Sequence, residues 1–97
     1  MSEQRLVWKY VLNPDTEELE LPRWSKPLAF LEQHGHPTLW VEVTVPAATR
    51  KRRVRIVPTG GEIPTGGLEW AYVGTCMMLG GALVWHLYME EEPLIRA

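Results

Sequence analysis

The stretch TLWVEVTVPAATRKRRVRIV, Thr38–Val57, decides the fold because it holds two strand patterns on either side of a proline. In its first half, apolar and other residues alternate with the period of two that a half-buried strand shows. One face of this predicted strand carries Leu39, Val41, Val43 and Val45, and the other carries Trp40, Glu42 and Thr44. The apolar face is expected in the core. Trp40 is therefore expected to point outward.

The second half predicts another strand, Lys51–Val57, with Val54 and Ile56 facing inward. Arg53 and Arg55 then face solvent, because they occupy the alternate positions. We assign Arg50–Arg52 to the loop before the strand, where a run of charges is expected to be solvated.

Further strand signals extend to both ends of the chain, separated by turn residues. They cover residues Arg5–Leu12, Thr16–Leu21, Leu28–Gln33, Leu68–Met78 and Ala82–Met89. The glycine- and proline-rich segment Pro58–Gly67 is a predicted loop. Seven short strands predict an all-β protein, a small antiparallel β-sandwich or barrel with at most one short helix. Ser25–His34 is the segment where that helix would lie, since Ser25 can cap it and Pro27 fits its first turn.

Length and composition indicate a single domain, residues 1–97, with flexible ends at 1–4 and 91–97. The core of so short a chain is thin, so a homo-oligomer is expected. The chain has five tryptophans and one cysteine, which excludes an intrachain disulfide and suits a reducing cytoplasm. Ala71–Met89 contains no charged residue, yet its glycine pair, Gly80-Gly81, favours a hairpin over a membrane span.

The basic residues are concentrated in Arg50–Arg55, although the net charge of the chain is −2. Without that cluster, five basic residues stand against twelve acidic ones, a balance of −7. This charge balance weakens the hypothesis of a nucleic-acid-binding protein. The acidic Glu90–Glu92 could meet the basic cluster head to tail between the subunits of an oligomer.

Four motifs in a fixed order resemble a family of small uncharacterised proteins encoded by tailed bacteriophages. They are VWKY at the N-terminus, TLWVEV, VRIVPTGGEIP, and YVGTCMMLGGALVWHLY near the C-terminus, the last with a Gly-Gly-Ala-Leu-Val-aromatic-His strand. The resemblance covers Val7–Tyr88. It implies a phage gene product that acts in the bacterial cytoplasm, without indicating an activity.

The candidate site residues are those that suit an anionic ligand. Guanidinium groups bind phosphate, glycine-rich turns can offer backbone N–H groups, and outward aromatic side chains can stack on a base. These residues are Arg53, Arg55, Thr59, Gly60, Gly61, Trp40, Tyr72 and His86.

No catalytic residue, metal ligand or cofactor is predicted, because neither serine lies in a nucleophile motif and His34-Gly35-His36 is a poor zinc signature. The function favoured by these residues is sequestration of a nucleotide-type signal of host defence. The alternative is a protein-interaction module that inhibits a host or defence protein.

Overall fold

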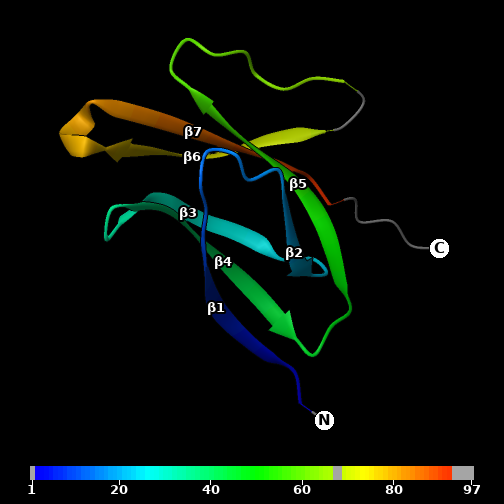
Figure 1. Ribbon diagram of the computed structural model, residues 1–97. Coiled ribbons are helices and arrows are strands. Elements are labelled where there is room, and N and C mark those ends of the chain that lie inside the picture. The colour runs from blue at the N-terminus through cyan, green and yellow to red at the C-terminus, as the bar shows by residue number, and fades with distance from the viewer. Residues whose placement is uncertain (1, 67–68, 93–97) are drawn as a thin grey trace.

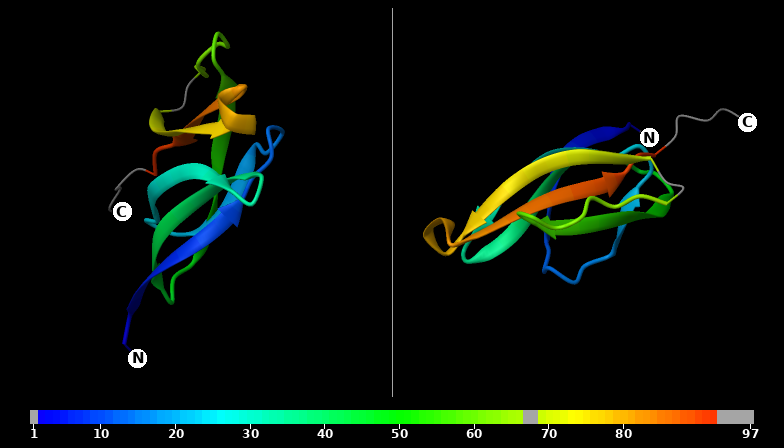
Figure 2. Two further views of the ribbon diagram at one scale, coloured as in Figure 1. Left: turned by 90° about the vertical axis from the view of Figure 1, so that its left-hand side faces the viewer. Right: turned by 90° about the horizontal axis from the view of Figure 1, so that it is seen from above.

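The computed structural model describes residues 2–66 and 69–92, which form two antiparallel β-sheets packed face to face (Figures 1 and 2). The strands are β1 (Gln4–Val11), β2 (Glu18–Pro22), β3 (Lys26–Gln33), β4 (His36–Val45), β5 (Thr49–Pro58), β6 (Trp70–Met78) and β7 (Leu83–Glu90). One sheet has the order β1-β4-β3 and the other has the order β2-β5-β7-β6. The predicted all-β sandwich of seven strands is confirmed.

The core lies between the two sheets, where the alternating residues of β4 and β5 meet. Leu39, Val41 and Val43 of β4 are fully buried, as is Val54 of β5, and Ile56 of β5 is buried. Phe30, Cys76, Leu87 and Met89 complete most of this layer from β3, β6 and β7. The strand faces predicted for Thr38–Val57 are therefore confirmed for these residues.

The helix considered for Ser25–His34 is wrong, because Lys26–Gln33 of this segment form strand β3, which pairs with β4. His34 and Gly35 join the two strands as a two-residue turn in which both residues have positive φ, 54° and 82°. Such a turn matches the twist of a hairpin, so its geometry favours strand pairing over a helix.

The two sheets approach most closely where β3 passes β6, and Gly74 makes that approach possible. A Cβ atom at Gly74 would lie 3.2 Å from Phe30 Cβ and 3.4 Å from the Phe30 backbone nitrogen. Any larger residue would push the two strands apart, because protein interiors have no free space for such an atom. β6 also carries a register shift between Tyr72 and Gly74, which re-aims its side chains.

The Gly80-Gly81 turn is present as the short 3-10 turn η1 (Leu79–Gly81), so Ala71–Met89 forms the predicted hairpin. In residues 2–66 and 69–92, no helix is long and apolar enough to cross a membrane. The predicted loop lies between β5 and β6, although Gly67 falls outside the described residues. Flexible ends were predicted at residues 1–4 and 91–97. Gln4 belongs to β1, and the backbone N–H of Glu91 donates to the Glu69 carbonyl. Residues 1 and 93–97 lie outside the described part of the chain.

The Cys76 thiol provides a direct test of this packing, because its side chain is fully buried on the core face of β6. Burial raises the pKa of this thiol, which keeps it in the unreactive protonated form at neutral pH. We expect a thiol reagent to label Cys76 at least about 100-fold more slowly in buffer than in concentrated guanidinium chloride, because reaction requires opening of the core. Fast labelling of the native protein would contradict the placement of β6.

Candidate ligand-binding site

The outer face of the four-stranded sheet carries polar and aromatic side chains in cross-strand rows. Tyr72 of β6 lies opposite Tyr88 of β7, and Tyr88 lies opposite Arg55 of β5. The rings of Tyr72 and Tyr88 meet edge to face with their centroids 5.7 Å apart. One row therefore runs from an exposed tyrosine to an exposed arginine.

His86 fixes the next row through both of its ring nitrogens. Nε2 lies 2.9 Å from Thr59 Oγ1, and Nδ1 lies 3.0 Å from Thr75 Oγ1. The Thr75 hydroxyl is also hydrogen-bonded to the Tyr72 hydroxyl. These hydrogen bonds link four side chains in a row, from Thr59 through His86 and Thr75 to Tyr72. They hold Tyr72 in position and connect the end of β5 to β6.

A cavity of about 420 Å³ opens where the first residues of β3 and β6 diverge. Trp24 and Tyr72 line it as aromatic residues, and Lys26 and Arg52 contribute positive charge. Its apolar wall consists of Pro27, Ala71, Val73 and Met89, and its acidic residues are Glu91 and Glu92. This composition, mostly apolar with a few polar groups, is typical of a small-molecule pocket.

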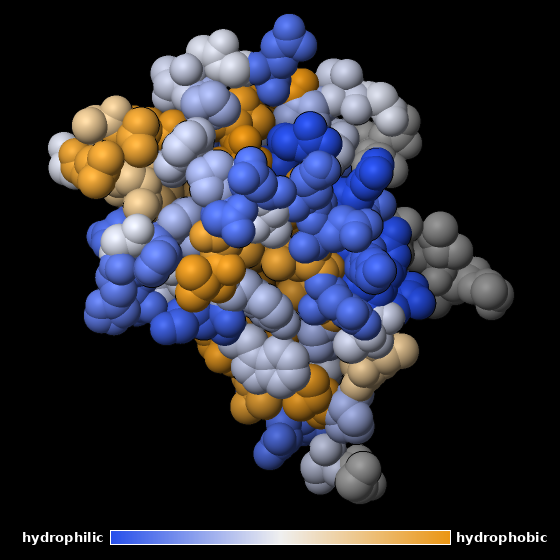
Figure 3. Space-filling model, in the orientation of Figure 1, coloured by the Kyte–Doolittle hydropathy of each residue, from blue (hydrophilic) through white to orange (hydrophobic). Residues whose placement is uncertain are grey.

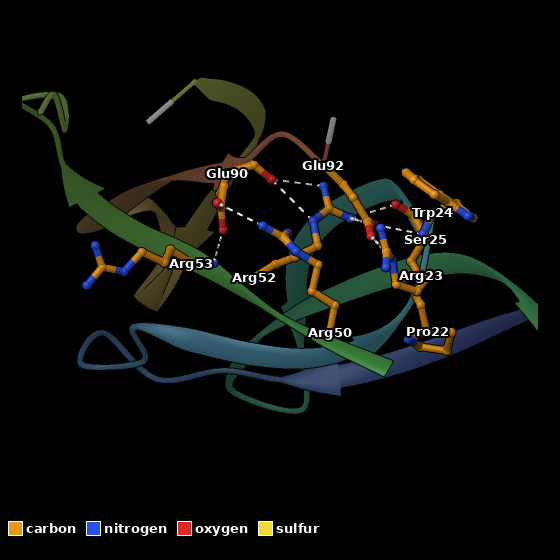
Figure 4. Close-up of polar contacts among 9 residues, drawn as sticks. All are labelled: Pro22, Arg23, Trp24, Ser25, Arg50, Arg52, Arg53, Glu90 and Glu92. Carbon is orange, nitrogen blue, oxygen red and sulfur yellow. Dashed lines mark hydrogen bonds and ion pairs between the residues drawn. The ribbon is translucent and has the colours of Figure 1, made fainter. Parts of the chain in front are cut away.

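Arg52 lines this cavity with only 5% of its surface exposed. Figure 4 shows its contacts with Ser25, Glu90 and Glu92. Its guanidinium donates to the Ser25 carbonyl at 2.7 Å and to the Glu90 carbonyl at 2.9 and 3.2 Å. Glu92 lies 3.9 Å away as an ion-pair partner. Burial lowers the pKa of Arg52, although the nearby carboxylates oppose that effect.

The assignment of Arg50–Arg52 to a loop is wrong, because all three residues belong to β5, and the expected solvation holds for Lys51 alone. The side chain of Arg50 is partly buried and lies 3.3 Å from Glu90. Arg52 takes the inward direction because it is two residues before Val54, on the same face of the strand. The acidic Glu90 and Glu92 thus meet the basic segment within one chain.

Trp24 lies at the mouth of the cavity in a backbone conformation that is rare for an aromatic residue, with φ of 66°. Its backbone N–H donates to Glu92 Oε1 at 2.7 Å, and the Arg23 guanidinium stacks on its ring, 4.6 Å from the ring centroid. Glu92 also accepts from Arg23 Nε at 2.9 Å. These contacts hold the Trp24 ring in place. The ring is also accessible, because 45% of the residue is exposed.

Arg53 and Arg55 point away from the core, as predicted, and their side chains form no ion pair with the described residues. In Figure 4 the Arg53 guanidinium extends away from the buried charges. Both arginines line a second hollow together with Asp15, Glu17 and Glu18. This acidic surrounding reduces the positive potential that a highly charged ligand would need.

The other predicted site residues are not all brought together. Trp40 faces outward from the three-stranded sheet, opposite Lys9 and Ala29, so it lies on the other side of the molecule from Tyr72. Gly60 lies in the turn after β5, and the Gly61 N–H is already donated to the Pro58 carbonyl at 2.8 Å. Thr59 contributes its hydroxyl to His86.

Trp24, Lys26 and Arg52 were not predicted, although one of them had a signal in the sequence. The alternation that places Val54 and Ile56 inward also places Arg52 inward, because the three residues share a face. Trp24 and Lys26 lie near a turn, so their position beside β6 depends on the packing of two distant segments.

The fold and the cavity define a small all-β sandwich with an aromatic-walled pocket at the seam between its sheets. The chain belongs to the family described as a domain of unknown function, DUF7352, which matches residues 3–96. No curated protein and no solved structure matches it. Within residues 2–66 and 69–92, no group of three or more metal-ligating side chains is present.

Proposed function

We propose that this protein is a binding module for a nucleotide-type ligand that carries one or two negative charges. The base would enter the cavity between Trp24 and Tyr72, and the phosphate would lie across Tyr88 toward Arg55. The observation that carries the proposal is that Tyr72 both lines the cavity and begins the row that ends at Arg55.

The dimensions of the sheet support this arrangement. Neighbouring strands are about 4.8 Å apart, so Tyr72 and Arg55 are separated by about 10 Å across β7. A nucleotide bridges such a distance between its base and its phosphate. Stacking on an aromatic ring contributes about 1–3 kcal/mol per base, and a guanidinium adds charge-assisted hydrogen bonds.

The charges around the site limit the ligand class. Asp15, Glu17 and Glu18 share the hollow of Arg53 and Arg55, and Glu91 lines the cavity. A triphosphate would be repelled by these carboxylates, whereas a mononucleotide or a cyclic nucleotide carries less charge. The carboxylate of Glu91 could accept hydrogen bonds from the amino group of a base.

The biological setting is also a proposal. The resemblance to proteins of tailed bacteriophages supports a phage accessory protein that acts in the cytoplasm of a bacterial host. There it would sequester a nucleotide signal of host defence. Sequestration requires affinity and abundance without catalysis, so a preformed pocket is sufficient.

We expect a panel of mononucleotides and cyclic nucleotides to raise the melting temperature of the protein, with one class producing the largest shift. Tyr72→Ala should weaken binding about tenfold or more in calorimetry, because it removes the stacking surface, and Arg55→Glu should weaken it by a similar factor. Lys51→Glu is the matched control, since Lys51 is an exposed cation on the same strand opposite Glu20. Equal losses in all three variants, or no shift with any nucleotide, would refute the proposal.

A protein-interaction module is the second candidate, and the exposed Trp24 with Arg23 stacked on it favours this alternative. Tryptophan and arginine are enriched among residues that dominate binding energy at protein interfaces. Stoichiometric recovery of one host protein, abolished by Trp24→Ala and unaffected by nucleotides, would favour this second candidate.

A further inference from the structure

Strand β1 forms one edge of the three-stranded sheet and is exposed along nearly its whole length (Figure 1). It pairs with β4 without interruption over eight residues, Gln4–Val11. Its other side therefore offers a regular row of backbone N–H and C=O groups to an additional strand.

Both faces of β1 carry exposed apolar side chains, although the outer face also carries Arg5 and Lys9. Leu6 and Trp8 lie on the core side, opposite Val43 and Val41, yet they remain 37% and 38% exposed. Val7 and Val11 lie on the outer side and are about 60% exposed. Figure 3 shows hydrophobic surface in the lower part of the molecule, through which β1 and β4 run in Figure 1.

The other sheet edges formed by the described residues carry features that oppose strand addition. β2 has five residues, ends at Pro22 and carries exposed glutamates, and β3 contains Pro27 at a register shift. β6 is interrupted by the shift between Tyr72 and Gly74. Prolines, bulges and charges are the usual means of protecting an edge, whereas β1 has an uninterrupted register and no proline.

The two cations of β1 do not protect its edge, because both are directed over its own sheet. Arg5 donates to Glu42 at 2.8 Å, and Lys9 donates to Gln33 at 2.8 Å. The contact with Arg5 also lowers the pKa of Glu42. Both partners come from the neighbouring strands β4 and β3, on the side away from the free edge.

We propose that a second copy of this chain pairs with β1, so that two three-stranded sheets join into one six-stranded antiparallel sheet. A two-fold axis would pass beside Leu6, placing Leu6 opposite the same residue of the second copy. This register brings Glu3 of each copy opposite Lys9 of the other. In the dimer the Lys9 ammonium would turn from Gln33, which it contacts in the single chain, to Glu3 of the second copy, and two complementary charge pairs would form.

Neighbouring registers are less favourable. An axis beside Val7 would place Arg5 opposite Lys9, and like charges directly opposite one another destabilise a sheet. An axis beside Trp8 would place Glu3 opposite Asn13 and lose both charge pairs. The charge pattern of β1 is therefore complementary to itself in the register centred on Leu6.

Cysteine substitution along β1 tests the partner and the register together. Residues directly opposite in an antiparallel pair have Cα atoms about 4.5–5.5 Å apart, within the range of a disulfide. We expect Leu6→Cys to form a disulfide-linked dimer under mild oxidation, while Val7→Cys and Trp8→Cys form little. The buried Cys76 adds little background.

The unmodified protein should also have twice the monomer mass of 11.1 kDa in light scattering at micromolar concentration. A monomer at every concentration tested would overturn the proposal. This holds even if β1 then proves to bind a different protein. A dimer cross-linked mainly at Val7→Cys or Trp8→Cys would overturn the register.

A charge exchange provides an independent check that does not touch the apolar residues. Lys9→Glu places two glutamates opposite each other and should weaken the dimer about tenfold. The double variant Glu3→Lys, Lys9→Glu restores the opposite pairing and should recover most of the affinity. Lys51→Glu, on the other sheet, is the control, and failure of the double variant to recover would overturn the register.

Discussion

Phe30→Ala is expected to lower the free energy of unfolding by about 3–5 kcal/mol, because it empties a large part of a thin core. Phe30 is the largest fully buried side chain of residues 2–66 and 69–92, with 1% of its surface exposed. It lies where β3 approaches Gly74 of β6, so neither strand can move inward to fill the space without a clash. The residual cavity therefore remains and adds to the lost burial.

Chemical denaturation followed by tryptophan fluorescence measures this loss as a shift of the midpoint. Leu31→Ala is the matched control, because Leu31 is the next residue of β3 and is 53% exposed. We expect the control to change the free energy of unfolding by less than about 0.5 kcal/mol. A similar loss in both variants would contradict the packing of β3 against β6.

Local patterns were sufficient to predict the strands, since each strand has its own alternation of apolar residues or its own flanking turn residues. Alternation placed Val54 and Ile56 inward and Arg53 and Arg55 outward, and the structure agrees. The hairpin at Gly80-Gly81 was likewise predicted from its two glycines. These features depend on residues close in the chain.

The site was harder to predict because it depends on contacts between distant segments. Trp24 and Tyr72 meet at one cavity only because β3 packs against β6, and no local pattern specifies that pairing of sheets. Trp40 and Tyr72 were both predicted to point outward, and they were assigned to one site. They belong to different sheets, however, and the outer faces of the two sheets lie on opposite sides of the molecule. Strand order must be known before exposed residues can be grouped into a site.

Arg52 shows a different limit of sequence interpretation. The charge run Arg50–Arg52 predicted a solvated loop, whereas the alternation that places Val54 inward also places Arg52 inward. Buried arginines are rare unless their hydrogen bonds are satisfied. The groups that satisfy Arg52 are the carbonyls of Ser25 and Glu90, which no sequence pattern identifies as partners.

Arg52→Ala is expected to lower the free energy of unfolding by about 3 kcal/mol, which corresponds to a melting temperature lower by about 12–24 °C for a chain of this size. The loss has two parts. The carbonyls of Ser25 and Glu90 lose their donors, and Glu92, whose side chain is 3% exposed, loses a nearby positive charge.

Arg53→Ala is the control for Arg52→Ala, because it changes the adjacent arginine on the exposed face and should cost less than about 0.5 kcal/mol. Arg52→Lys should fall between the two, since the ammonium keeps the charge but cannot reach both carbonyls with the geometry of a guanidinium. Thermal unfolding of the three variants measures this order. If Arg52→Ala were no more damaging than Arg53→Ala, Arg52 would not be the buried link between β5, the Ser25 turn and the end of β7. The basic segment would then be solvated, as its charge alone suggested.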